Sequence, residues 1–160
     1  MLNAAKSLAL LERDCQIVVV CGRNLAAYNC LTANVAALNA GKRVRFRVES
    51  YIDAEKMATL MHASDLMIGK PGGATMAEAL ASGCPLMVYT PLMIPGQEAF
   101  NAELLQREGA AWVARRPKDL RTAVSDLLAN PDRLETMRSC AVRLARPDAA
   151  TEIANLLAVL

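Results

Sequence analysis

The sequence predicts an α/β protein in which a Rossmann-like parallel sheet carries helices on both faces. Short β-rich runs alternate with longer helical patterns through the first two thirds of the chain, as they do in βαβ units. Some of these runs, such as residues 18–20, are apolar at consecutive positions, which is typical of strands buried on both faces. Together the two observations favour a parallel sheet over an antiparallel one.

The first element is an amphipathic helix over residues 2–14, and no strand stands ahead of it. Strands are then expected at residues 16–21, 44–48, 65–69, 85–89 and 110–114. The helices between them are expected at residues 24–40, 54–64, about 75–82 and 97–108.

From Pro117 onward the chain reads as three helices, broken near "NPD" and "RPD". The last helix carries an apolar stripe, and we expect this stripe to pack against something. Its members are Ala149, Ile153, Leu156, Leu157 and Leu160.

The missing leading strand has a structural consequence, because the first strand of a doubly wound sheet is usually central. Without it, strands 16–21 and 65–69 would flank an empty slot with two rows of unpaired backbone groups. We therefore expect the chain to close the gap, to take up a strand from a partner, or to be poorly stable.

Composition and charge exclude several classes of protein. The chain has 160 residues, 54% of them hydrophobic and 21% charged, which fits one domain over residues 1–160 and argues against disorder. The net charge of +2 gives no reason to expect a nucleic-acid partner. Five scattered cysteines favour a reducing compartment, and no apolar run approaches membrane-span length. These features predict a cytoplasmic protein that at most rests on a membrane.

The basic run "GKRVRFRV" has the period of a strand with one wet face. Arg43, Arg45 and Arg47 would lie on one side of this strand, with Val44 and Phe46 on the other. The favoured interpretation is a charged edge strand, and the alternative is a patch that touches anionic lipid.

The segment "DLMIGKPGGATMAEAL" places a glycine turn at the carboxyl end of a predicted strand, where parallel sheets bind ligands. Gly72 and Gly73 would allow positive φ and close approach of a ligand to the main chain. A helix that begins near Thr75 would direct unpaired N–H groups at this space, which suits a phosphate. Lys70 is either a phosphate partner or an ordinary exposed lysine. Thr75 and Glu78 also fit a capping box, in which both side chains merely satisfy the helix start.

Two further segments follow strand ends. In "PGQEAFNA", Gln97, Glu98 and Asn101 could address sugar hydroxyls, although an acidic first turn would by itself account for Glu98. In "CGRN", from Cys21 to Asn24, the backbone could face the same cleft, or Asn24 could simply cap a helix.

Metal and triad chemistry have no support in the sequence. The cysteines lack zinc-type spacing, and the single histidine, His62, lies on a predicted helix away from any turn at the cleft. We expect His62 to be structural or merely exposed, and we expect no Ser/His/Asp triad.

Taken together, "CGRN", "KPGGATMAEAL" and "PGQEAFNA" resemble the donor-binding half of the glycosyltransferases that make monogalactosyl- and glucosyl-diacylglycerol. The wider family includes the lipid-linked N-acetylglucosamine transferase of peptidoglycan synthesis. The resemblance is clear over residues 1–115. It implies the C-terminal half of a GT-B fold, here without its first strand, and an inverting transfer that needs no cofactor and no metal.

The resemblance also implies site roles. Gly72, Gly73, Ala74 and Thr75 would lie by the diphosphate of UDP-galactose or UDP-glucose, and Glu78 would bind the ribose hydroxyls, which reverses the capping interpretation. Gln97, Glu98 and Asn101 would address the sugar. The full set implied to bind the UDP-sugar is Gly22, Asn24, Tyr51, Lys70, Gly72, Gly73, Ala74, Thr75, Glu78, Gln97, Glu98 and Asn101.

The sequence departs from the family pattern in the base pocket and in its extent. Ser50 and Tyr51 stand where the family usually has Gly-Phe, and serine restricts the backbone more than glycine. The acceptor domain, with the diacylglycerol site and the catalytic base, is expected to be absent, so this chain alone should not transfer sugar. The alternatives are UDP-N-acetylglucosamine with a lipid-linked muramyl acceptor, and a non-catalytic nucleotide-binding module.

Overall fold

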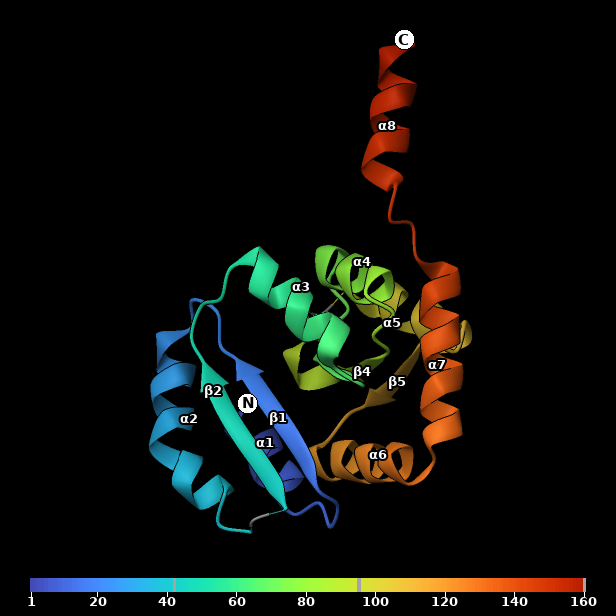
Figure 1. The fold of residues 1–160 in the computed structure, drawn as a ribbon. Coiled ribbons are helices and arrows are strands. Elements are labelled where there is room, and N and C mark those ends of the chain that lie inside the picture. Colours follow the sequence, from blue (N-terminus) through green and yellow to red (C-terminus); the bar gives the residue numbers. More distant parts are fainter. Residues whose placement is uncertain (42, 95, 160) are drawn as a thin grey trace.

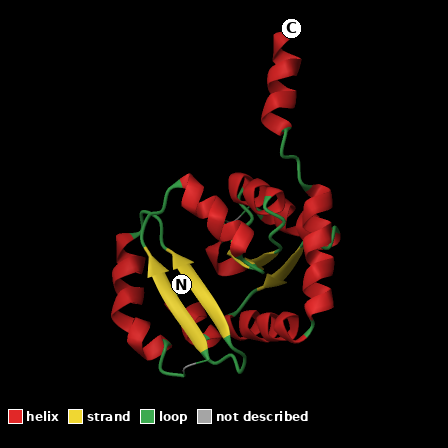
Figure 2. Ribbon diagram, in the orientation of Figure 1, coloured by secondary structure: helices red, strands yellow, loops and turns green. Residues whose placement is uncertain are grey.

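A computed structural model describes residues 1–41, 43–94 and 96–159, and it shows parallel strands flanked by helices (Figure 2). The strands are β1 (Cys15–Val20), β2 (Val44–Glu49), β3 (Met67–Gly69), β4 (Leu86–Tyr89) and β5 (Ala111–Ala114). The helices are α1 (Leu2–Leu8), α2 (Leu25–Leu38), α3 (Ala54–Ala63), α4 (Gly73–Ala81), α5 (Ala99–Arg107), α6 (Pro117–Ala129), α7 (Pro131–Leu144) and α8 (Ala149–Ala158). A 3₁₀ turn, η1, spans Thr90–Leu92.

Every strand pairing within the described residues is parallel, which confirms the predicted α/β class. The strands form a two-stranded sheet, β1-β2, and a three-stranded sheet, β3-β4-β5. The ladder is interrupted between β1 and β3, where the sequence predicts an unfilled central position, and no described segment closes this interruption with a strand.

Two hydrophobic clusters connect the two sheets with the helices that pack on them. The first core cluster lies where α1, α2 and α6 pack on both sheets, and its members include Leu8, Leu11, Leu31, Leu38, Val44, Phe46, Met87, Tyr89, Leu120, Leu127 and Met137. The second core cluster joins the β3-β4-β5 sheet to α4, α5 and α7, and it contains Ala79, Leu80, Leu86, Val88, Ala102, Leu105, Ala110, Ala111 and Ala141. Because the first cluster draws on both sheets, the two sheets share a core despite the broken ladder.

Local chemistry explains where several helices begin and end. The side chain of Asp53 accepts a hydrogen bond of 2.8 Å from the N–H of Lys56 and so caps α3. Helix α1 ends at Leu8, short of the predicted residue 14, because the chain tightens into 3₁₀-type turns there. This turn buries Leu11 to 5% exposure and redirects the chain into β1.

Strand β2 confirms the predicted edge strand. Val44 and Phe46 are buried while Arg43, Arg45 and Arg47 are exposed, and among the described strands β2 pairs with β1 alone. Lys42, within the same basic run, lies outside the described residues.

The three predicted C-terminal helices are present, but the last one does not pack as expected. All described residues of α8 from Ala150 onward are exposed, including Ile153, Leu156 and Leu157, and the helix projects away from the body of the protein (Figure 1). Leu160, also assigned to the apolar stripe, lies outside the described residues. None of the helices within the described ranges is long and apolar enough to cross a membrane.

We expect deletion of residues 148–160 to change the free energy of unfolding by less than about 0.5 kcal/mol, because α8 buries almost nothing against the rest of the chain. By contrast, Leu120→Ala should cost about 2–5 kcal/mol, because the Leu120 side chain is fully buried. Urea denaturation of both variants measures the difference. A large loss on deletion would show that α8 packs on the body.

Candidate functional site

The glycine turn opens directly onto the start of α4. Gly72 is the N-cap residue, with φ −64° and ψ 147°, and the helix begins at Gly73 rather than near Thr75. Neither Gly72 nor Gly73 has positive φ, so the turn does not use the positive φ that glycine would allow at either position. What the glycines supply is space, because a Cβ built on Gly73 would meet no atom within 4 Å.

The capping-box interpretation of Thr75 and Glu78 is also wrong. Because Gly72 is the N-cap, Thr75 lies inside the first turn of α4, and no side chain caps this helix. The N–H groups of Gly73, Ala74 and Thr75 have no partner in the described backbone. Glu78 is exposed one turn further along, and its carboxylate makes no ion pair or hydrogen bond with the described residues. Its carboxylate is therefore free for a ligand.

An ion pair joins the glycine turn to the "PGQE" loop. The Lys70 ammonium donates to Glu98 Oε1 at 2.7 Å, and the N–H of Ile94 donates to Glu98 Oε2 at 2.9 Å. Glu98 is only 5% exposed, whereas the Lys70 side chain is 41% exposed. The hydrogen bond from Lys70, helped by that from Ile94, lowers the pKa of the Glu98 carboxyl below its ordinary value of 4.5.

A second contact joins the same two loops. The side-chain amide of Asn101, in the first turn of α5, donates to the carbonyl of Pro71 at 2.9 Å. Glu98 stands at the N-cap of α5 but makes no capping bond, because its carboxylate turns back to Ile94 and Lys70. Gln97 is exposed beside it. Pro95, within the same motif, lies outside the described residues.

The remaining predicted residues form a separate group at the ends of β1 and β2. Gly22 has φ +59°, so this turn requires glycine, and its N–H donates to the carbonyl of Ser50. The side chain of Asn24 accepts from the N–H of Ala27 at 2.9 Å, so Asn24 caps α2. The Arg23 guanidinium lies 5.8 Å from the centroid of the exposed Tyr51 ring.

The structure therefore brings the predicted site together as two groups. The Lys70–Glu98 ion pair and the Asn101–Pro71 hydrogen bond lie beside the start of α4 at Gly72. Gly22, Asn24 and Tyr51 follow the strands of the other sheet. No hydrogen bond or ion pair among the described residues links the two groups. The broken ladder between β1 and β3 explains this, since each sheet carries its own group.

Sequence reasoning missed two features of these groups. The N–H of Ile94 that holds Glu98 gives no sequence signal, because any residue but proline supplies it. The stacking of Arg23 on Tyr51 joins residues far apart in the chain, although an aromatic and an arginine that each follow a strand could have suggested it.

Other candidate chemistry finds no support. His62 is exposed on α3, and its Nδ1 lies 2.9 Å from the carbonyl of Ala58 in the same helix. Within residues 1–41, 43–94 and 96–159, no cluster of three His, Cys, Asp or Glu side chains could hold a metal ion.

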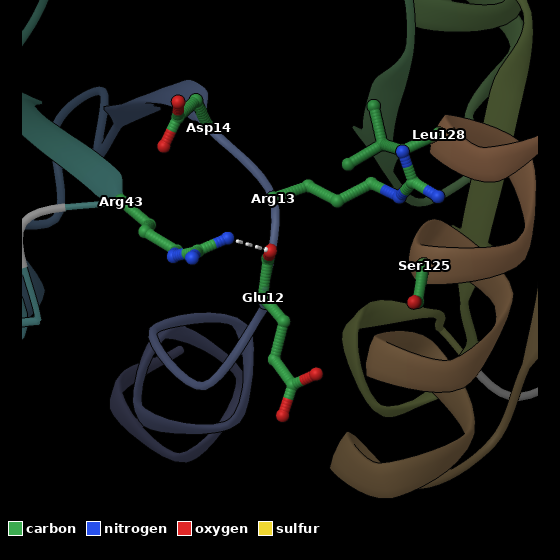
Figure 3. A pocket seen from close by; sticks show the side chains of 6 residues that line it. All are labelled: Glu12, Arg13, Asp14, Arg43, Ser125 and Leu128. Carbon is green, nitrogen blue, oxygen red and sulfur yellow. Dashed lines mark hydrogen bonds between the residues drawn. The ribbon is translucent and has the colours of Figure 1, made fainter.

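A shallow depression of about 570 Å³ lies at the opposite end of the β1-β2 sheet, before the strands begin (Figure 3). Its lining residues are Glu12, Arg13, Asp14, Arg43, Ser125 and Leu128. The Arg13 side chain extends toward Leu128, and Arg43 donates to the backbone carbonyl of Glu12. Ligands of parallel sheets bind beyond the carboxyl ends of the strands, so this depression is not the candidate site.

The parallel α/β fold and the glycine turn that opens a helix at a strand end are features of nucleotide-binding domains. Residues 1–153 match the model of the glycosyltransferase family 28 C-terminal domain, and the chain belongs to this family. The predicted resemblance to glycosyltransferases is thereby confirmed.

Individual relatives agree with this assignment. The chain is 40% identical over 123 residues to a processive diacylglycerol beta-glucosyltransferase of Bacillus subtilis (strain 168), covering 77% of this chain and 30% of that protein. It is 38% identical over 129 residues to the enzyme of the same name from Bacillus pumilus (strain SAFR-032), covering 81% of this chain and 32% of that protein. The chain thus spans about a third of the length of these relatives.

Solved structures confirm the fold as half of a GT-B glycosyltransferase. WaaG, a glycosyltransferase involved in lipopolysaccharide biosynthesis, superposes with a TM-score of 0.60 at 16% identity, over 89% of this chain and 38% of its own. The calicheamicin glycosyltransferase CalG4 gives a TM-score of 0.58 at 18% identity, over 92% of this chain and 44% of its own. At these identities the likeness concerns the fold alone.

We expect Lys70→Met to destabilise the protein by about 1–3 kcal/mol, because it leaves the buried Glu98 carboxylate with the Ile94 N–H as its remaining partner among the described residues. Lys56→Met is a matched control, since Lys56 makes only an exposed pair with Asp53 and its loss should cost little. Urea denaturation at pH 7 measures both. Equal effects of the two substitutions would contradict the structural role of the Lys70–Glu98 pair.

The stability that the Lys70–Glu98 pair contributes should depend on pH. Since the folded-state pKa of Glu98 lies below its ordinary value of 4.5, the pair contributes stability that is full above that value. This contribution is lost as the pH falls below 4.5 toward the lowered folded-state pKa. The difference between wild type and Lys70→Met should therefore shrink over this acidic range, and a difference independent of pH would contradict it.

Proposed function

We propose that this chain is the UDP-sugar-binding part of an inverting glycosyltransferase that transfers glucose or galactose to the hydroxyl of diacylglycerol. The observation that carries the proposal is the open space at Gly73, onto which the unpaired N–H groups of α4 face. Family membership and the names of the Bacillus relatives support the reaction class and the lipid acceptor.

The diphosphate would lie over the first turn of α4. There the N–H groups of Gly73, Ala74 and Thr75 can donate to its oxygens, and the positive end of the helix dipole favours its charge. The Lys70 ammonium has three donors and gives one to Glu98, so it can also reach a phosphate oxygen. Main-chain and ammonium donors of this kind stabilise a departing diphosphate without a metal ion.

Glu78 is the proposed partner of the ribose. Its free carboxylate lies on α4 one turn beyond the proposed diphosphate site, and two carboxylate oxygens can accept from two vicinal hydroxyls. The exposed Gln97, next to the Lys70–Glu98 pair, would address the sugar, with Glu98 and Asn101 fixing the loop beneath it. Gly22, Asn24 and Tyr51 would line the base side from the other sheet.

The acceptor would be held outside this chain, which covers about a third of the relatives' length. Because diacylglycerol is a membrane lipid, the complete enzyme would work at the membrane surface through peripheral contact. The cytoplasmic side follows from the proposed UDP-sugar donor.

Two substitutions test nucleotide binding by separating it from stability. Gly73→Ala should fold normally, because its Cβ meets no protein atom within 4 Å, yet it should weaken UDP binding by about tenfold or more by occupying the space of the diphosphate. Glu78→Gln should weaken UDP binding by about tenfold, since a charged hydrogen bond to the ribose contributes roughly 1.5–3 kcal/mol. Calorimetric titration with UDP and thermal unfolding give the two readouts.

Glu152→Gln on the projecting helix α8 is the matched control and should leave UDP affinity unchanged. Parallel titrations with UDP-glucose, UDP-galactose and UDP-N-acetylglucosamine identify the sugar. Unchanged UDP affinity in Gly73→Ala and Glu78→Gln would overturn the proposed site, and preference for UDP-N-acetylglucosamine would replace the diacylglycerol branch with the muramyl one.

A further inference from the structure

Two large apolar side chains are exposed in the segment that carries the sugar side of the candidate site. Ile94 is 46% exposed and Phe100 is 70% exposed, and Gln97 lies between them in the sequence. The chain has two phenylalanines, and the other one, Phe46, is 5% exposed in the first core cluster. Exposure of a phenylalanine is therefore specific to this segment.

The exposure of Ile94 is fixed by hydrogen bonds of its own backbone. Its N–H donates to Glu98 Oε2 at 2.9 Å, and its carbonyl accepts from the N–H of Gln97 at 3.3 Å. Glu98 is itself buried and bonded to Lys70. Because both backbone groups of Ile94 are bonded, the loop holds this residue in a position where its side chain meets solvent.

The exposure of Phe100 follows from the way α5 is anchored. Ala102 and Leu105 are the buried residues of this helix, and both pack in the second core cluster. Asn101, next to Phe100, donates to the carbonyl of Pro71 in the glycine turn at 2.9 Å. These two attachments fix the rotation of α5 about its axis, so Phe100 remains on the side that faces solvent.

The position of the two side chains gives their exposure a meaning. A single exposed apolar residue is ordinary on a protein surface. Residues 94–100, however, follow the carboxyl end of β4, where parallel sheets bind their ligands, and they contain two such residues beside the polar groups of the candidate site. A ligand that is polar at one end and apolar at the other matches this combination.

The charge of the loop limits the kind of apolar partner. Glu98 is the one ionisable residue in the sequence from 90 to 102, and its carboxylate is neutralised by the Lys70 ammonium at 2.7 Å. The surface at Ile94 and Phe100 therefore offers no free charge to an anionic lipid head group. It suits an uncharged lipid.

The proposed reaction brings a lipid of this kind to the same place. A reacting hydroxyl has to come within about 3–3.5 Å of the carbon that it attacks. In diacylglycerol this hydroxyl stands on a glycerol whose other two oxygens carry fatty-acid esters, so the acyl chains begin a few bonds away. In a muramyl acceptor the hydroxyl stands on a polar sugar ring. Exposed apolar side chains beside the donor sugar fit the first acceptor and not the second.

We propose that Ile94 and Phe100 contact the acyl chains of the diacylglycerol acceptor next to its reacting hydroxyl. The inference rests on the proposed function and extends it, because it gives this chain a part in selecting the acceptor as well as in binding the donor. The Lys70–Glu98 pair and the Asn101–Pro71 bond then hold the sugar side and the lipid side of the site in one loop.

Flotation of the 160-residue chain with lipid vesicles tests the inference without any nucleotide. Vesicles of phosphatidylcholine alone are compared with vesicles that also contain dioleoylglycerol. We expect the wild type to bind the dioleoylglycerol vesicles more tightly. Phe100→Ser and Ile94→Ser should each weaken that binding by about tenfold, because each removes apolar surface that the acyl chains cover. Phe100→Leu keeps an apolar side chain and should retain most of the binding.

Val142→Ser is the matched control, since Val142 is 59% exposed on α7 and belongs to no part of the candidate site. It should bind the dioleoylglycerol vesicles as the wild type does. Thermal unfolding by circular dichroism checks that each variant folds, which we expect because the substituted side chains are exposed.

Three results would overturn the inference: no vesicle binding by the wild type, equal binding to both kinds of vesicle, or equal losses in Val142→Ser and Phe100→Ser. Titration of the same wild-type chain with UDP separates this failure from failure of the proposed function. A chain that binds UDP but not the dioleoylglycerol vesicles overturns the acceptor contact alone. A chain that binds the vesicles but no UDP overturns the proposed function, and the acceptor contact falls with it.

Discussion

The Lys70–Glu98 ion pair is the contact on which the arrangement of the candidate site depends. It joins the turn after β3 to the loop after β4, and the Asn101–Pro71 hydrogen bond supports it from the first turn of α5. Because Glu98 is buried and hydrogen-bonded, a shift of the turn that carries Lys70 would leave the Glu98 carboxylate buried without its ion-pair partner. The start of α4 is thereby held in place with its N–H groups uncovered, which is preorganisation of the kind an anion site requires.

Much of the fold could be predicted from the sequence, because strongly patterned segments form their elements wherever packing agrees. The alternation of Arg45 and Arg47 with Val44 and Phe46 predicted a one-sided edge strand, and β2 is one. The breaks at "NPD" and "RPD" separate α6, α7 and α8 as expected. The glycine turn and the "PGQE" loop, in this order, predicted a glycosyltransferase domain, and the family match over residues 1–153 confirms it.

What could not be predicted depends on contacts between distant residues. Thr75 and Glu78 have capping-box spacing, but the helix starts earlier because Gly72 and Gly73 permit it, and spacing carries no information about that choice. Glu98 looked like a sugar contact or a dipole partner, and its bond to Lys70 joins residues 28 positions apart. The apolar stripe on α8 predicted that this helix packs against the rest of the chain, yet its apolar residues are exposed. An amphipathic pattern shows that a helix has an apolar side, but it does not show which surface that side contacts.

The arginines of β2 and Asn39, at the end of α2, also determine how this domain would aggregate. An unpaired strand edge can pair with the same edge of another copy and so start aggregation. Charged side chains on such a strand make this pairing unfavourable. The Asn39 side chain occupies the backbone hydrogen-bonding groups of Phe46, and Arg45 and Arg47 are exposed on the same strand. Both features disfavour pairing of another strand with the outer edge of β2. The edge of β1 that faces away from β2 carries no such charged side chains among the described residues, so we expect it to be one of the edges through which copies of the isolated domain associate.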